Sequence, residues 1–142
     1  MLLNMSRKEV FISATSADFG SYRQVVKDAL LRLGAHPVEE SNFWTDYCEL
    51  QDLLARRLDP CDGVIHLAGF HYGGRPKQEP NIPRRSWTQW EYYRAAEEHA
   101  KPMYRFLALE DCAFDSRPAQ DVEGCRHFCA RPTTVRACGV VR

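Results

Sequence analysis

Apolar residues alternate between short runs and helical stripes along the first 110 positions of this chain. Residues 10–13 form a short apolar run that predicts a buried strand, and a central one because it opens the domain. A helical stripe follows up to Leu33, and Gly34 stands where a helix-terminating glycine belongs. Residues 35–39 predict a second strand. This order of elements is typical of a parallel α/β fold. The apolar positions of the helix are Tyr22, Val25, Val26, Ala29, Leu30 and Leu33.

The same alternation continues to residue 109. Residues 50–58 predict a short amphipathic helix that ends at Asp59 and Pro60, and residues 63–69 and 103–109 predict a third and a fourth strand. Arg105 is unusual for a buried strand, so we expect the fourth strand to lie towards an edge of the sheet. Beyond residue 110 the pattern weakens, and residues 133–141 could supply a fifth strand.

Residues 87–100 predict a helix that Pro102 ends. Ser86 is the expected N-cap, and Gln89 stands three residues later, as in a capping box. At about 100° per residue, Glu91 shares a face with Trp87, Trp90 and Arg94, opposite a face made by Tyr92, Ala96 and Ala100. Glu91 is then either a solvated first-turn acid favoured by the helix dipole or a partly desolvated carboxylate beside aromatic rings.

Several polar and aromatic segments are expected at the carboxyl ends of the predicted strands, where open parallel sheets bind ligands. Asp18, with Ser16, is the expected N-cap of the first helix. Residues 43–47 are either a loop whose rings cover the sheet edge or a flap that stacks on a flat ligand. Residues 73–74 are either an ordinary turn or a close approach of backbone to ligand. The candidate binding residues are Ser13, Ala14, Thr15, Ser16, Asp18, Phe43, Trp44, Tyr72, Gly73, Gly74, Ser86, Trp87 and Trp90.

Two other sets of residues could bind a ligand or a metal ion, but a structural role explains each of them better. His66 lies inside a predicted strand and is interpreted as a core or edge histidine rather than a ligand. Cys125 and Cys129 have one zinc half-site spacing, with Cys112, His127 and Cys138 in the same region, but no second pair matches it. We therefore expect free thiols and no metal.

Composition narrows the function classes. The chain has 142 residues, enough for one domain, with 19 basic and 19 acidic residues. This balance gives no electrostatic case for nucleic acid or an anionic membrane as a partner. The first residues are too polar for a signal peptide, and no run approaches the ~20 apolar residues of a membrane span. A cytoplasmic protein with reduced cysteines is expected.

Three motifs together resemble TIR-like domains, chiefly the bacterial branch. Residues 10–18 are similar to the opening strand and acid of that branch, which reads V-F-I-S-S-T. Residues 62–69, with Tyr72 and Gly73, resemble its third strand and Tyr-Gly turn. Residues 86–96, with Lys101 and Pro102, resemble its S-x-T-x-x-E-Y helix and the strand that follows. The resemblance covers residues 8–110 of a single domain, 1–142, which can be the N-terminal domain of a longer protein.

The resemblance implies a flavodoxin-like fold of three layers, with about five parallel strands in the order 2-1-3-4-5. For enzymatic members it implies cleavage of the nicotinamide–ribose bond of NAD, in bacterial defence or signalling, with NAD as substrate and no cofactor. Glu91 stands where those members carry their catalytic glutamate. It also implies self-association, which we expect through residues 43–47. One alternative is a non-catalytic homotypic interaction module, and another is an enzyme similar to nucleoside deoxyribosyltransferases.

Overall fold

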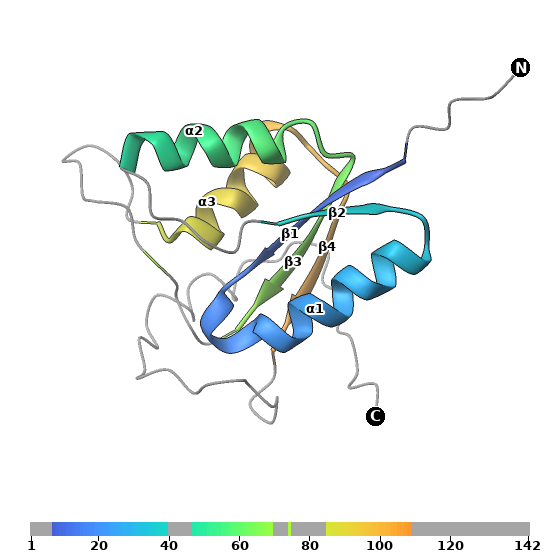
Figure 1. Ribbon diagram of the computed structural model, residues 1–142. Helices are drawn as coiled ribbons and strands as arrows, with labels where there is room; N and C mark the ends of the chain where they lie inside the picture. The colour runs from blue at the N-terminus through green and yellow to red at the C-terminus, as the bar shows by residue number, and fades with distance from the viewer. Residues whose placement is uncertain (1–6, 40–46, 70–73, 75–84, 109–142) are drawn as a thin grey trace, which may run out of the picture.

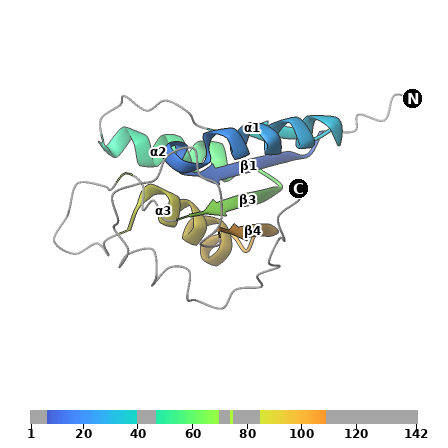
Figure 2. The ribbon, with the colours of Figure 1, turned by 90° about the horizontal axis from the view of Figure 1, so that it is seen from below.

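The computed structural model describes residues 7–39, 47–69, 74 and 85–108. Four parallel strands form one sheet in the order β2-β1-β3-β4 (Figure 1): β1 (Glu9–Ala14), β2 (His36–Val38), β3 (Gly63–Ala68) and β4 (Met103–Leu107). Figure 2 shows β1, β3 and β4 side by side. The predicted parallel α/β fold and the adjacency of the first and third predicted strands are therefore confirmed. The described sheet has four strands, not five, and the predicted fifth strand, residues 133–141, lies outside the described residues.

Helices cover both faces of this sheet (Figure 1). On one face lie α2 (Tyr47–Leu58) and α3 (Trp87–Tyr93), which continues as the π-helix η1 (Arg94–Glu98). Phe11 and Val64 of the sheet pack there against Leu54 and Leu58 of α2 and Ala95 of η1. On the other face, α1 (Ser16–Arg32) contributes Phe19 and Val26, which pack with sheet residues Ala14, Ile65, Leu67 and Phe106. Because successive side chains of each strand point to opposite faces of the sheet, the strands contribute to two separate apolar layers, one on each face.

The helix α1 confirms one sequence prediction and corrects another. Its last turn closes as a Schellman motif, in which Gly34 has φ +77°. The Gly34 N–H donates to the Leu31 carbonyl, and the Ala35 N–H donates to the Leu30 carbonyl. Its N-cap residue is Thr15 rather than Asp18, and Phe19 interrupts the helical dihedrals at φ −126°.

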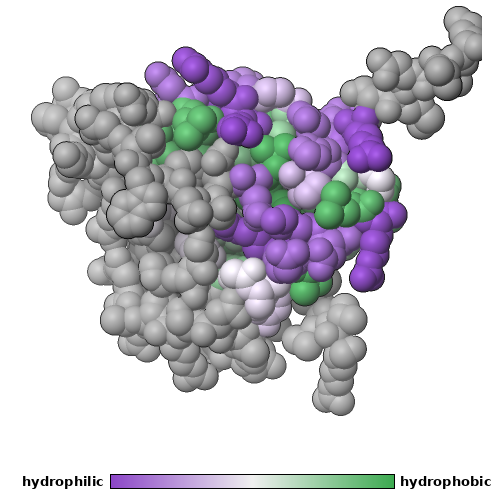
Figure 3. Space-filling view, viewed as in Figure 1, coloured by the Kyte–Doolittle hydropathy of each residue, from purple (hydrophilic) through white to green (hydrophobic). Residues whose placement is uncertain are grey.

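The apolar stripe of α1 is wider than the face that meets the sheet. Leu30 is buried and Val26 packs against the sheet, whereas Val25 is 67% and Leu33 is 82% exposed. In the space-filling view, apolar atoms form separate patches among hydrophilic ones (Figure 3). An apolar periodicity in the sequence therefore marks the helix correctly but overstates how much of it is core.

The helix predicted over residues 87–100 is shorter and changes type at Arg94. In η1 the His99 N–H donates to the Arg94 carbonyl five residues earlier, at 3.1 Å, which is the π-helical pattern. The helix stops at Glu98, and Ala100 has a positive φ of 47°. The helical wheel placed Glu91 and Tyr92 on opposite faces of the helix, but both residues are buried. The buried side of α3 is therefore wider than either predicted face. Within the described ranges, no helix is both long and apolar enough to cross a membrane.

Candidate functional site

Glu91 is a buried carboxylate that faces the carboxyl end of β1. Only 9% of the residue is exposed, and its Oε2 accepts a hydrogen bond of 2.5 Å from Ser13 Oγ. Ser13 is itself buried, with 1% exposed, one residue before the end of β1. Glu91 is therefore not the solvated first-turn acid of the simpler interpretation. The two residues lie 78 positions apart in the chain, and the sheet–helix packing brings them together.

The local sequence of α3 fixes where Glu91 points. The predicted capping box is present: the Gln89 N–H donates to Ser86 Oγ, and the Ser86 N–H donates to Gln89 Oε1. The Gly74 carbonyl accepts the Trp87 N–H at 3.0 Å, so a further donor of the first turn is satisfied. One turn after Glu91, the fully buried Ala95 packs into the core below α2. The spacing of four residues therefore directs Glu91 to the same sheet-facing side.

A row of buried polar side chains crosses the sheet beneath α3. In the strand register, Ser13 of β1 is paired with His66 of β3, which is paired with Arg105 of β4. His66 is fully buried, and its Nδ1 lies 3.1 Å from Ser13 Oγ. Arg105 is 4% exposed, and its guanidinium lies over the Tyr92 ring, 4.7 Å from the ring centroid. The Tyr92 ring also lies 5.4 Å from the His66 ring.

This row sets the charge of its histidine. Burial lowers the pKa of His66 to about 3, and the positive charge of Arg105 adds to the effect. His66 is therefore a neutral imidazole at physiological pH, consistent with its interpretation as a core histidine. β4 is one of the two edge strands of the described sheet, as expected, but Arg105 is buried under α3 rather than exposed at that edge. Sequence reasoning missed both residues as parts of the site, and the available signal was a polar residue in each of two apolar strands.

Some of the remaining candidate residues are described by the structure, and the others lie outside the described residues. Ala14 and Thr15 are buried beside Ser13, and the Ala14 carbonyl accepts a hydrogen bond from Arg23 of α1. The half-buried Trp87 and Trp90 rings lie 6.3 Å apart and pack against the core below α2. Ser16 and Asp18 open α1, and Gly74 is exposed beside Trp87. The candidates Phe43, Trp44, Tyr72 and Gly73 lie outside the described residues.

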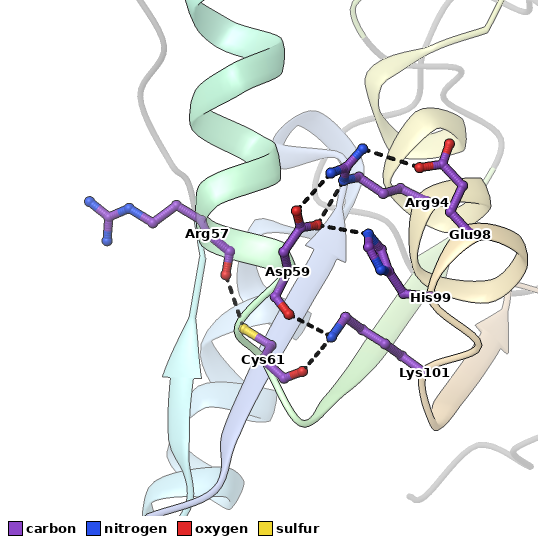
Figure 4. Close-up of polar contacts among 7 residues, drawn as sticks. All are labelled: Arg57, Asp59, Cys61, Arg94, Glu98, His99 and Lys101. Atoms are coloured by element: carbon purple, nitrogen blue, oxygen red, sulfur yellow. Dashed lines mark hydrogen bonds and ion pairs between the residues drawn. The ribbon is translucent and has the colours of Figure 1, made fainter.

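Arg94 was expected on the same face as Glu91, and the structure pairs it elsewhere. Its guanidinium donates to both carboxylate oxygens of Asp59 at 2.7 Å and to Glu98 at 3.1 Å (Figure 4). Hydrogen bonding to Arg94 holds the pKa of Asp59 below its ordinary value. His99 Nε2 lies 3.2 Å from the same carboxylate, and Lys101 donates to the Asp59 carbonyl. This cluster joins the end of α2 to η1 before β3 begins, so it holds the scaffold and not the Glu91 site.

Cys61 lies in the scaffold cluster at the end of α2 (Figure 4). Cys61 is buried, its thiol donates to the Arg57 carbonyl, and burial raises its pKa to about 11. Among the described residues, no three His, Cys, Asp or Glu side chains are grouped so that they could hold a metal ion. The cysteines weighed for zinc, Cys125, Cys129 and Cys138, lie outside those residues.

Comparison with known proteins gives a family but no activity. A family model described as a domain of unknown function, DUF4062, matches residues 9–127, which span the sheet, α3 and Glu91. No curated protein matches the chain. The family match extends over most of the 142 residues. The chain therefore belongs to the DUF4062 family.

Proposed function

We propose that this protein is a TIR-like NAD glycohydrolase that cleaves the nicotinamide–ribose bond of NAD. The observation that carries the proposal is the buried Glu91 carboxylate, bonded to Ser13 at the carboxyl end of a central parallel strand. The resemblance to TIR-like domains gives this position its catalytic role. The carboxyl edge of a parallel sheet is also where this class of fold binds nucleotides.

The proposed reaction needs a negative charge more than a proton donor. As the bond between ribose C1′ and the nicotinamide nitrogen breaks, its electron pair leaves with the already cationic ring, which departs as neutral nicotinamide. The ribose develops oxocarbenium character, as in glycoside hydrolysis. Water then adds to C1′ and loses a proton to solvent, which gives ADP-ribose. Glu91 would stabilise the developing positive charge, and its burial strengthens that interaction because less water screens it.

Other parts of the chain fit a dinucleotide substrate. Ala14 and Thr15 continue from Ser13 into the first turn of α1, where backbone N–H groups can receive a pyrophosphate. Trp87 and Trp90 are half-buried, so part of each ring remains as aromatic surface for a flat leaving group. The proposal adds Phe43, Trp44 and Tyr72, which lie outside the described residues. We propose further that residues 133–141 complete a flavodoxin-like sheet as its fifth strand. Self-association through residues 43–47, in a cytoplasmic defence or signalling protein, belongs to the same proposal.

The test is cleavage of NAD by concentrated wild-type protein, followed as release of nicotinamide. Glu91→Gln keeps the size of the side chain and removes its charge. Loss of such an electrostatic group commonly lowers the rate by on the order of 10²–10³-fold. Glu97→Gln is the matched control, because Glu97 is exposed eleven residues beyond the N-cap Ser86, whereas Glu91 is buried and bonded to Ser13.

Three results would decide against the proposal. An active Glu91→Gln protein would refute the role of Glu91. A wild-type protein that releases no nicotinamide, even when concentrated, would favour the interaction module. Turnover of deoxynucleosides in place of NAD would favour a deoxyribosyltransferase-like enzyme.

A further inference from the structure

Ser13 lies between two buried partners, and its single hydroxyl proton can serve only one of them. Its Oγ is 2.5 Å from Glu91 Oε2 and 3.1 Å from His66 Nδ1. All three residues are at least nine-tenths buried. Glu91 comes from α3, Ser13 from β1 and His66 from β3, so the chain of contacts joins three elements.

These contacts allow two directions for the Ser13 proton, and each direction fixes what His66 Nδ1 must carry. In the first, Glu91 is a carboxylate that accepts from the Ser13 hydroxyl, and Ser13 accepts from an N–H on His66 Nδ1. In the second, Glu91 is a neutral acid that donates to Ser13, and Ser13 donates to an unprotonated Nδ1, so that His66 carries its proton on Nε2. The doubly protonated imidazolium does not compete, because burial lowers the pKa of His66 to about 3. The tautomer of His66 therefore reports which way the Ser13 proton points.

We propose that His66 is a positioning residue that, by donating Nδ1–H to Ser13, commits the Ser13 proton to Glu91 and holds Glu91 as an oriented carboxylate. A separation of 2.5 Å is typical of a hydroxyl that donates to a charged oxygen. Arg105, the register neighbour of His66, adds a buried positive charge to the same row.

The functional consequence rests on the proposed NAD cleavage. A carboxylate that is already charged and oriented need not reorganise as the oxocarbenium character develops. His66 touches no substrate in this scheme and acts only through Ser13. Its loss should therefore lower kcat rather than weaken substrate binding.

The direct test is the tautomer, read from the ring nitrogen and carbon shifts of protein labelled at histidine. The chain has five histidines, and the spectrum of His66→Asn identifies the signal that belongs to His66. We expect the proton on Nδ1 in the wild type. A proton on Nε2 would overturn the proposal. This measurement needs no turnover, so it decides the proposal even if the protein does not cleave NAD.

A kinetic experiment compares two replacements of His66 that are similar in size. The amide of Asn can place an N–H where Nδ1 stands, whereas Leu cannot donate. Residues that orient a metal ligand from behind are worth about 10–100-fold in activity, and we expect the same scale for a residue that orients a carboxylate. We expect His66→Leu to lose about that factor in kcat with KM within about twofold, and His66→Asn to stay within a few fold of wild type.

Equal loss in both His66 variants, or a change confined to KM, would overturn the proposal. If His66→Leu does not fold, Ser13→Ala takes its place. It removes the bridging hydroxyl and should show the same fall in kcat. An unchanged kcat in folded Ser13→Ala would also overturn the proposal.

Discussion

The ion pair between Asp59 and Arg94 should stabilise the fold measurably, because it ties the end of α2 to η1. Both nitrogen–oxygen pairs are at 2.7 Å, and the side chains are only 34% and 23% exposed. Fully exposed pairs contribute about 0.2–1 kcal/mol, and breaking a fully buried one costs about 3–5 kcal/mol. Since a third of Asp59 is exposed to screening solvent, we expect Asp59→Asn to lose about 1–2 kcal/mol of unfolding free energy.

The assay is thermal unfolding at pH 7 and at acid pH. For a domain of this size, that loss lowers Tm by about 3–6 °C. Arg94 depresses the folded-state pKa of Asp59, so this contribution is present at neutral pH and disappears as pH falls below the ordinary value of 3.8. The difference between wild type and Asp59→Asn should therefore shrink in acid. Glu98→Gln is the matched control, since the Glu98 side chain is 56% exposed and an i,i+4 pair is worth about 0.3–0.5 kcal/mol.

A double-mutant cycle completes this test. If Asp59→Asn and Arg94→Gln destabilise through the same pair, the double variant should lose less than the sum of the two single losses. Strictly additive losses, or an Asp59→Asn protein as stable as wild type at pH 7, would refute the reasoning. Lys101 donates to the Asp59 backbone carbonyl, so that contact remains in every variant.

Two further predictions concern helix ends and use the same unfolding assay. Ser86→Ala removes the α3 cap and should cost about 1 kcal/mol, while Ser86→Thr, whose hydroxyl can still accept the Gln89 N–H without burying a charge, should cost less; equal losses would count against the cap. Gly34→Ala should also cost about 1 kcal/mol from backbone conformation alone, because Gly34 has φ +77° and an added Cβ would meet nothing within 4 Å. Gly34→Asn, which tolerates this conformation better, should lose less, and a Gly34→Ala protein at wild-type stability would contradict the argument.

The sequence was informative wherever the determining contacts are local. The capping box of Ser86 and Gln89 and the closing glycine of α1 depend on residues within a few positions of one another, and both are present. The strand pattern likewise predicted the parallel sheet and the central place of β1, and the resemblance to TIR-like domains implied the strand order that puts β3 beside it. Local signals were weaker at boundaries. The start of α1 and the change to π-helix at Arg94 depend on dihedrals that the hydrophobic pattern does not encode.

The sequence identified only part of the candidate site. Ser13 could be named as the last residue of a predicted strand, and Glu91 as an acid on a predicted helix. Nothing in the sequence showed that the two are hydrogen-bond partners. His66 and Arg105 were interpreted as a core residue and an edge residue, because single polar positions in a strand do not reveal their register. The same gap explains why Arg94 was expected beside Glu91 although it pairs with Asp59.

The sequence by itself determined the order of strands and helices along the chain, the C-terminal end of α1, the N-cap of α3 and the presence of one acid on α3. Only the tertiary structure decided that this acid is buried and that Ser13, 78 positions away, donates to it. It also decided that His66, 53 positions from Ser13, lies beside it and not on the opposite face. Helical and turn signals act over about four residues, whereas strand register and helix–sheet packing are set by the summed burial of many distant side chains.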